Sequence, residues 1–353
     1  MKIQSANYNL HRALPLFVGL VGLLVLAACS PATSQPATAT QVLPAATQPL
    51  PTETSAPTPT PQPGKAWLVT AEESPALQAA LTELALQAGW TVETRSALQA
   101  SELVPEVRVL VFTAPPANLS ELLSAGTQAQ FVVLAPVDLP AAPNLSVIRL
   151  RPENQAFVAG HIAALYAADW RAGGLLPADG PLGAGLQEAF VNGARYFCGT
   201  CTSGWPLGVF YPQVGALPAA SDGAAWQAAA VTLLDTHKVN LFFVSGEAAR
   251  PEVYSYLQGK DQFGASVRLV GVTAPPPELK DQWLATVRLD AAAALSELWP
   301  AVAAGQGGQV VAAPVVLEDL GEETSGIGRM RLVEELMQEI AAGRIYPFLI
   351  PPE

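Results

Sequence analysis

The chain is poor in the residues that carry most enzyme chemistry and most nucleic-acid binding. Its 353 residues include three Cys, three His and 18 Lys plus Arg against 30 Asp plus Glu, for a formal net charge of −12. A nucleic-acid partner is not expected, because it needs a basic face that displaces counterions from phosphates. The same deficit argues against adhesion to anionic lipid through a polybasic patch.

Catalytic and cofactor motifs are also missing. The sequence has no G-x-S-x-G nucleophile elbow and no G-x-x-x-x-G-K-[ST] phosphate loop. Gly183-Ala184-Gly185 is followed by Glu188 where the dinucleotide fingerprint needs Gly. His161 and His237 each stand alone on a predicted helix. We therefore expect no enzyme, no cofactor and no metal site, although two scattered carboxylates could still meet in space.

The N-terminus predicts export and lipidation. Residues 13–28 form an uncharged apolar run of 16 residues, short for a membrane span of roughly 20 and suited to a signal peptide over 1–28. Leu26-Ala27-Ala28-Cys29 resembles the bacterial lipobox, whose Cys becomes the acylated first mature residue. This predicts an extracytoplasmic protein anchored to the bacterial cell membrane through Cys29 alone. An ordinary signal peptide that contains a Cys is the alternative.

Residues 29–64 have the composition of a disordered tether. From Ser30 to Gly64 there are nine Pro, eight Thr and one charged residue, Glu53. Such a segment cannot bury a core and should stay extended, reaching up to about 100 Å at roughly 3 Å per residue. An ordered proline-rich domain is the alternative.

Residues 65–353 alternate strand and helix patterns. The strands are rich in Val, Leu and Phe without polar alternation, which is typical of parallel sheets covered on both faces. Gly89 and Gly343 are expected to close helices. About 290 residues exceed one doubly wound sheet, so we predict an α/β fold of two Rossmann-like lobes. The expected ranges are 65–169 and 274–308 for lobe 1, 170–273 and 309–325 for lobe 2, and 330–342 for a C-terminal helix.

Cys198-Gly199-Thr200-Cys201 is the one local chemical signal in the mature domain. With Cys29 acylated, these two Cys are an even count in an oxidising compartment. No further Cys or nearby His is available for a metal. The pair follows the helix around Phe190, whereas a redox thiolate favours a helix N-terminus. We favour a structural disulfide over free thiols or a redox pair.

Three segments resemble one family. Residues 153–165 (ENQAFVAGHIAAL) are similar to the E-x-x-x-F-x-x-G-x-x-A-A-L helix of the basic-membrane-protein family, the nucleoside-binding lipoproteins of ABC importers. Residues 189–195 (AFVNGAR) resemble that family's F-x-x-G-A-[KR] helix, and residues 340–348 (IAAGRIYPF) resemble its ending.

The resemblance implies a type I periplasmic-binding-protein fold, in which crossover strands join two lobes that close over a small molecule. It also implies ABC permease and ATPase subunits as partners. Two family motifs differ here. The acidic loop after the first strand reads Thr70 to Pro75, without Phe or Asn, and the late G-x-D-x-D reads Gly271 to Pro275, without Asp.

Candidate ligand-binding residues follow the ends of predicted strands, where ligands bind in doubly wound folds. Several have alternatives: Ser74 as a helix cap, Asp138 as a solvated turn, Tyr211 as core at the end of a 207–211 strand, and residues 245–247 as a plain turn. The set is Glu73, Ser74, Thr113, Asp138, Tyr211, Ser245, Gly246, Glu247 and Thr273.

The sequence thus predicts a membrane-anchored solute-binding protein of an ABC importer, with a nucleoside-like or other small polar ligand. The main rival is a sensory or degenerate ligand-binding lipoprotein not coupled to transport.

Overall fold

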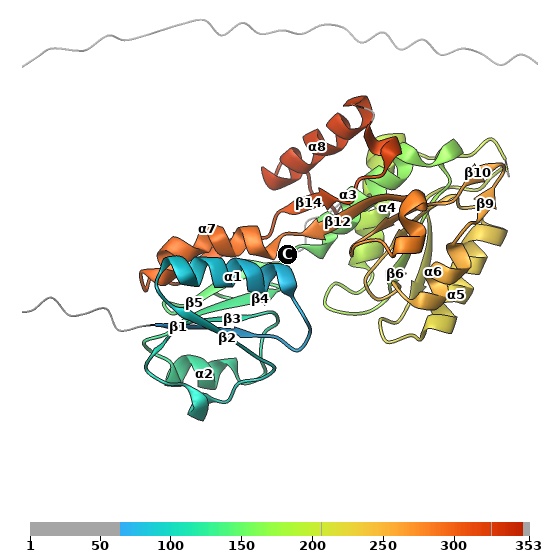
Figure 1. Cartoon of the computed structure of the whole chain (residues 1–353). Coiled ribbons are helices and arrows are strands. Elements are labelled where there is room, and N and C mark those ends of the chain that lie inside the picture. Colours follow the sequence, from blue (N-terminus) through green and yellow to red (C-terminus); the bar gives the residue numbers. More distant parts are fainter. Residues whose placement is uncertain (1–63, 206, 326, 349–353) are drawn as a thin grey trace, which may run out of the picture. The chain divides into compact units, whose positions relative to one another are not determined.

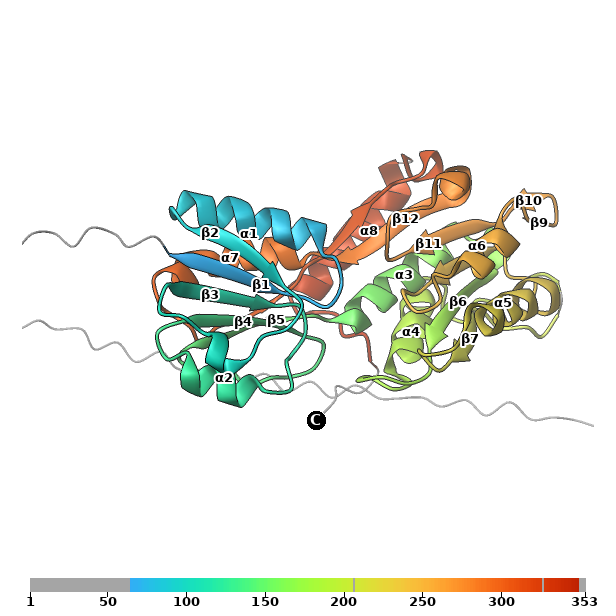
Figure 2. The same cartoon turned by 60° about the horizontal axis from the view of Figure 1, so that its bottom comes forward.

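The computed structural model describes residues 64–205, 207–325 and 327–348. The predicted signal peptide (1–28) with Cys29, and all of the tether (29–64) except Gly64, lie outside these residues. The described part forms two α/β lobes, each built on a six-stranded sheet (Figures 1 and 2).

The first sheet is parallel throughout, and its neighbours run in the order β13-β5-β4-β3-β1-β2. Helices α1 and α7 bury apolar side chains on one face and α2 on the other (Figure 1). Burial on both faces explains the continuous apolar strands. The elements are β1 (Lys65–Val69), α1 (Pro75–Gln87), β2 (Thr91–Arg95), β3 (Val107–Phe112), α2 (Leu119–Ala125), β4 (Gln130–Ala135), β5 (Leu145–Arg149), α7 (Ala291–Ala303) and β13 (Val310–Ala312).

The second sheet runs in the order β14-β12-β11-β8-β6-β7, parallel except for the antiparallel pair β12–β14. Helices α3, α4 and α8 pack in the core on one face, and α5 and α6 on the other. The elements are α3 (Pro152–Tyr166), β6 (Ala172–Pro177), α4 (Gly185–Cys198), β7 (Gln213–Leu217), α5 (Gly223–Val231), β8 (Leu241–Val244), α6 (Pro251–Leu257), β11 (Arg268–Gly271), β12 (Trp283–Leu289), β14 (Val315–Glu318) and α8 (Ile327–Ala341). A separate hairpin pairs β9 (Asp261–Gln262) with β10 (Ala265–Ser266).

Within the described ranges the chain passes between the two sheets three times, and the crossings differ from the predicted lobe boundaries. Helix α3, expected in lobe 1, contacts β6, β8 and β12. Strand β12, also expected in lobe 1, belongs to the second sheet, and β13, expected in lobe 2, to the first. The crossings therefore fall after β5, after β12 and after β13. An apolar pattern shows that an element is buried but does not say against which sheet, and this is why the boundaries were displaced.

Two glycines bring α3 and α4 into backbone contact. A Cβ atom at Gly160 would lie 2.0 Å from the Phe190 carbonyl oxygen, and one at Gly193 would lie 1.9 Å from the Phe157 carbonyl oxygen. Only Gly permits so close an approach. The glycines that mark both family-like helices therefore have a packing role in this fold.

Candidate functional site

The carboxyl end of the first sheet carries a chain of hydroxyl groups. Thr113, directly after β3, donates a hydrogen bond from its Oγ1 to Oγ1 of Thr70, which follows β1, at 3.0 Å. The Thr70 hydroxyl donates in turn to the Glu72 carbonyl. Glu73 is exposed on the same loop. Strands β1 and β3 are parallel neighbours, so Thr113 and Glu73, which were predicted separately, lie at the carboxyl end of the same sheet.

Ser74 and Asp138 lie at this edge in settings that the sequence left open. Ser74 occupies the N-cap position of α1, but its side chain makes no capping hydrogen bond within the described part of the chain. Asp138 forms an ion pair with Arg149, the last residue of β5. The Asp138 side chain is 93% exposed and that of Arg149 only 13%. Asp138 is therefore a solvated carboxylate, as the alternative from the sequence allowed, and it also forms an ion pair at the end of the neighbouring strand.

A buried carboxylate lies just after the first crossing, and the sequence reasoning did not single it out as a site. Glu153 in the first turn of α3 is 5% exposed. Its Oε1 lies 3.7 Å from Nη1 of Arg151, while its Oε2 has no hydrogen-bond partner among the described residues. Burial raises the pKa of Glu153, against a smaller opposing effect of its own backbone N–H. The family-like motif that begins at Glu153 was the only signal of this position.

At the second sheet, polar groups follow β8 and β11. Ser245 is 6% exposed, and its Oγ has no hydrogen-bond partner among the residues described. Gly246 beside it is exposed, Glu247 is half-buried, and Thr273 after β11 is exposed. A buried hydroxyl next to an exposed glycine can accept a hydrogen bond from a bound molecule or donate one to it. Strands β8 and β11 are parallel neighbours, so these four predicted residues also lie together at the carboxyl end of their sheet.

Asp319 was missed by the sequence reasoning. The Thr286 hydroxyl lies 2.8 Å from Oδ2 of Asp319 and 3.3 Å from the Thr273 carbonyl oxygen. An acidic side chain from the segment after β14 therefore approaches the loop that follows β11. Sequence could not reveal this, because β14 joins the sheet antiparallel and from far along the chain.

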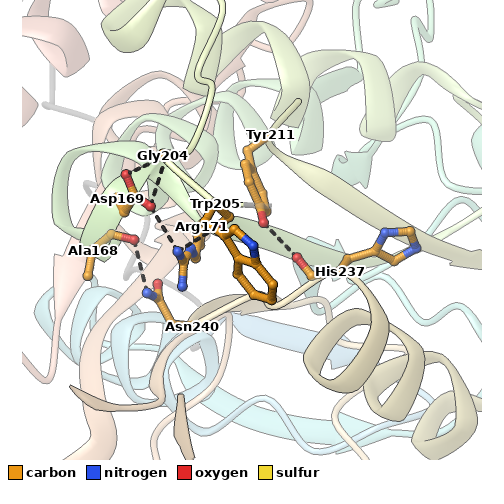
Figure 3. Close-up of polar contacts among 8 residues, drawn as sticks. All are labelled: Ala168, Asp169, Arg171, Gly204, Trp205, Tyr211, His237 and Asn240. Carbon is orange, nitrogen blue, oxygen red and sulfur yellow. Dashed lines mark hydrogen bonds and ion pairs between the residues drawn. The ribbon is translucent and has the colours of Figure 1, made fainter. Parts of the chain in front are cut away.

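Tyr211 does not belong to the site, and its predicted strand was wrong. Residues 207–211 form turns and one isolated bridge, and the strand is β7, at 213–217. Tyr211 is 1% exposed and donates from its hydroxyl to the His237 carbonyl at 2.7 Å (Figure 3). It precedes β7, so it lies at the amino end of the sheet, away from the strand ends where ligands bind. Its role is in the core.

Cys198 and Cys201 are joined as a disulfide at the end of α4, with their Cα atoms 5.1 Å apart. That separation lies within the range that a disulfide requires. The oxidation state in solution stays a prediction.

The described residues contain no group of three or more His, Cys, Asp or Glu side chains that could hold a metal ion. No helix among them has the length and apolarity to cross a membrane.

A cavity of about 300 Å³ lies beside the crossings, between α3, the β13–β14 segment and α8. Arg151, Pro314 and Tyr346 are among the residues that line it.

The fold is similar to those of solved ABC transporter solute-binding proteins. One, from Aeropyrum pernix, has a TM-score of 0.59 at 14% identity, covering 82% of this chain and 94% of that one. Another, from Conexibacter woesei, has a TM-score of 0.58 at 17% identity, covering 80% and 98%. A transcriptional activator of the comK gene from Bacillus halodurans has a TM-score of 0.53 at 13% identity, covering 80% and 99%.

These likenesses establish the fold class. The chain has the predicted α/β, type I periplasmic-binding-protein fold. No protein-family model matches the sequence, and no curated protein matches it.

Proposed function

We propose that this chain is an extracytoplasmic solute-binding protein, anchored to the bacterial cell membrane through acylated Cys29, that holds a small polar ligand between its two lobes. It delivers that ligand to the permease and ATPase subunits of an ABC importer. No covalent chemistry is required of the chain, because delivery needs only differential binding to two conformations.

The observation that carries the proposal is the placement of polar groups at the carboxyl ends of both sheets. The first sheet offers Thr113, Thr70 and Glu73, and the second offers Ser245 and Thr273. A ligand that contacts both sets favours a closed arrangement of the lobes. The Oγ of Ser245, for which the described residues supply no hydrogen-bond partner, is a group that such a ligand would satisfy.

The chemistry of these groups favours a ligand rich in hydroxyl and amide groups, such as a nucleoside. Carboxylates accept two hydrogen bonds from a diol. Glu73, which follows β1, and Glu247, which follows β8, are the residues that we propose for this role. The resemblance of residues 153–165 and 189–195 to the basic-membrane-protein family supports the same ligand class.

A thermal-shift panel of nucleosides, sugars and amino acids tests the binding claim. A ligand present at 100 times its Kd stabilises the folded protein by roughly 2.7 kcal/mol. Ser245→Ala should reduce this stabilisation, whereas Ser296→Ala, the same change at an exposed hydroxyl on α7, should leave it intact. No shift from any nucleoside would remove the nucleoside claim, and no shift from the whole panel would remove the binding claim.

Mass spectrometry of the mature N-terminus tests the anchor separately. We expect a diacylglyceryl-modified Cys29, and we expect Cys29→Ala to release the protein from the membrane fraction. An unmodified N-terminus at another residue would indicate an ordinary signal peptide.

A sensory lipoprotein is the second candidate, favoured by the departures at Thr70–Pro75 and at Thr273, where the family-like acidic motifs are replaced. Adjacent permease and ATPase genes, and ligand uptake that depends on this chain, would support the importer. Ligand binding without uptake would support the sensor.

A further inference from the structure

An exposed apolar surface lies at the amino end of the second sheet. It consists of Trp205, Leu207 and Phe210 from the loop after α4, and Phe263 from the β9–β10 hairpin; we call these four residues the aromatic surface. Their exposed fractions are 57%, 85%, 56% and 57%. Both segments precede parallel strands, β7 and β11. The aromatic surface therefore lies at the amino ends of the strands, opposite the carboxyl ends that carry the candidate ligand site.

The loop is held in place by polar contacts with Arg171 and Asp169. Arg171, 7% exposed, donates to the Trp205 carbonyl at 2.6 Å and to Oδ2 of Asp169 at 2.9 Å (Figure 3). The Asp169 carboxylate in turn accepts from the Gly204 N–H at 3.1 and 3.2 Å. A bridge between Thr202 and Phe210 closes the loop.

The same arginine joins the loop to the hairpin. Its Cζ lies 4.1 Å from the centre of the Phe263 ring, and the Trp205 and Phe263 rings meet at 5.8 Å. A buried guanidinium is costly unless it is paired and hydrogen-bonded. The fold therefore uses a buried cation to position side chains that themselves face solvent, and exposed apolar patches of a few hundred Å² often mark interaction sites.

Charge and area indicate what covers this surface. The loop has no charged side chain between Arg195 and Asp222, and the hairpin carries Lys260 and Asp261, whose charges offset each other, in a chain whose net charge is −12. Four apolar side chains at these exposures offer roughly 400–600 Å², less than the roughly 800 Å² per partner that a stable protein interface buries. A second copy of this chain is therefore a poor match, whereas aromatic side chains enter the interfacial layer of a bilayer without needing a complementary partner.

We propose that the aromatic surface inserts into the interfacial layer of an electrically neutral lipid bilayer, so that the second lobe rests on the membrane. This inference relies on the proposed anchoring outside the cell.

Vesicle flotation tests the proposal with the mature chain carrying Cys29→Ser, so that acyl chains do not contribute. We expect the protein to float with phosphatidylcholine vesicles independently of salt, and less with vesicles containing phosphatidylglycerol, because the chain is acidic. Leu207→Ser should weaken the partitioning roughly tenfold, since a buried leucine is worth about a factor of ten or more. Trp205→Ser should act in the same direction.

Leu86→Ser is the matched control, because Leu86 on α1 is also exposed, at 68%, but lies on the first lobe. It should not change flotation. Absence of flotation, or an equal loss with Leu86→Ser, would overturn the proposal. Concentration-dependent dimerisation that Leu207→Ser abolishes, without vesicle binding, would assign the surface to a second copy instead. Because the ligand panel and the mass of the N-terminus are separate readouts, failure here is distinguishable from failure of the proposed function.

Discussion

Replacing Gly160 by Ala should destabilise the protein, although Ala is the better helix former. In a solvent-exposed helix the change would stabilise by about 0.5–1 kcal/mol. Here the new Cβ would lie 2.0 Å from the carbonyl oxygen of Phe190, against ordinary contact distances of 3.4 Å and above. The obstacle is backbone, so no rotamer change relieves it, and α3 and α4 must separate by more than 1 Å.

Overpacking of this kind costs about 1–3 kcal/mol or more, and it also opens the apolar contacts of Phe157 and Phe190, which are buried in the same core. We expect a net loss of about 2 kcal/mol in the free energy of unfolding, or about 4–8 °C in Tm. Urea or thermal denaturation measures it. Gly328→Ala is the control, because that Cβ meets nothing within 4 Å on α8, and it should be neutral or slightly stabilising. If Gly160→Ala were as stable as the wild type, the close packing of α3 against α4 would be refuted.

Three further predictions concern titration and oxidation. Burial lowers the pKa of His161 from 6.5 to about 4. As the pH falls from 6.5 to 4 the unfolded chain is protonated first, so the free energy of unfolding should fall by on the order of 3 kcal/mol. His161→Phe should flatten the dependence of stability on pH in this interval, and an unchanged slope would contradict the prediction. Burial raises the pKa of Glu153 above 4.5, so the folded state keeps this carboxyl protonated to a higher pH than the unfolded state does, and the free energy of unfolding should fall as the pH rises above 4.5. Glu153→Gln should therefore be more stable than wild type at pH 7 and no longer more stable below about pH 4. Lower stability of the variant at pH 7 would show that the carboxylate is needed. Native mass spectrometry should find Cys198 and Cys201 two hydrogens lighter than the reduced pair, and ready alkylation of both would exclude the disulfide.

Much of the fold was predictable because it follows from local patterns. Apolar strands such as Val107–Phe112 indicated parallel sheets, and both glycines expected to close helices have positive φ, 73° at Gly89 and 68° at Gly343. The C-terminal helix was expected at 330–342 and spans 327–341. Each of these signals depends on backbone preferences or on burial, which neighbouring residues reveal.

The missed features depend on contacts between distant segments. Leu207–Tyr211 has the composition of a strand, but its loop is held by Asp169 and Arg171, and Tyr211 packs in the core. The Asp138–Arg149 pair depends on β4 lying beside β5, and the approach of Asp319 to Thr273 depends on an antiparallel strand at the sheet edge. Sequence patterns do not contain strand order, so these side-chain partners could not be derived.

The most direct test of the account is to titrate the best ligand of the thermal-shift panel by calorimetry against two variants, one from each sheet. Thr113→Val and Ser245→Ala should each weaken Kd by roughly tenfold, the value of one or two lost hydrogen bonds, while the free energy of unfolding without ligand stays near that of wild type. A ligand that is sensitive to only one sheet, or to neither, would contradict binding between the lobes.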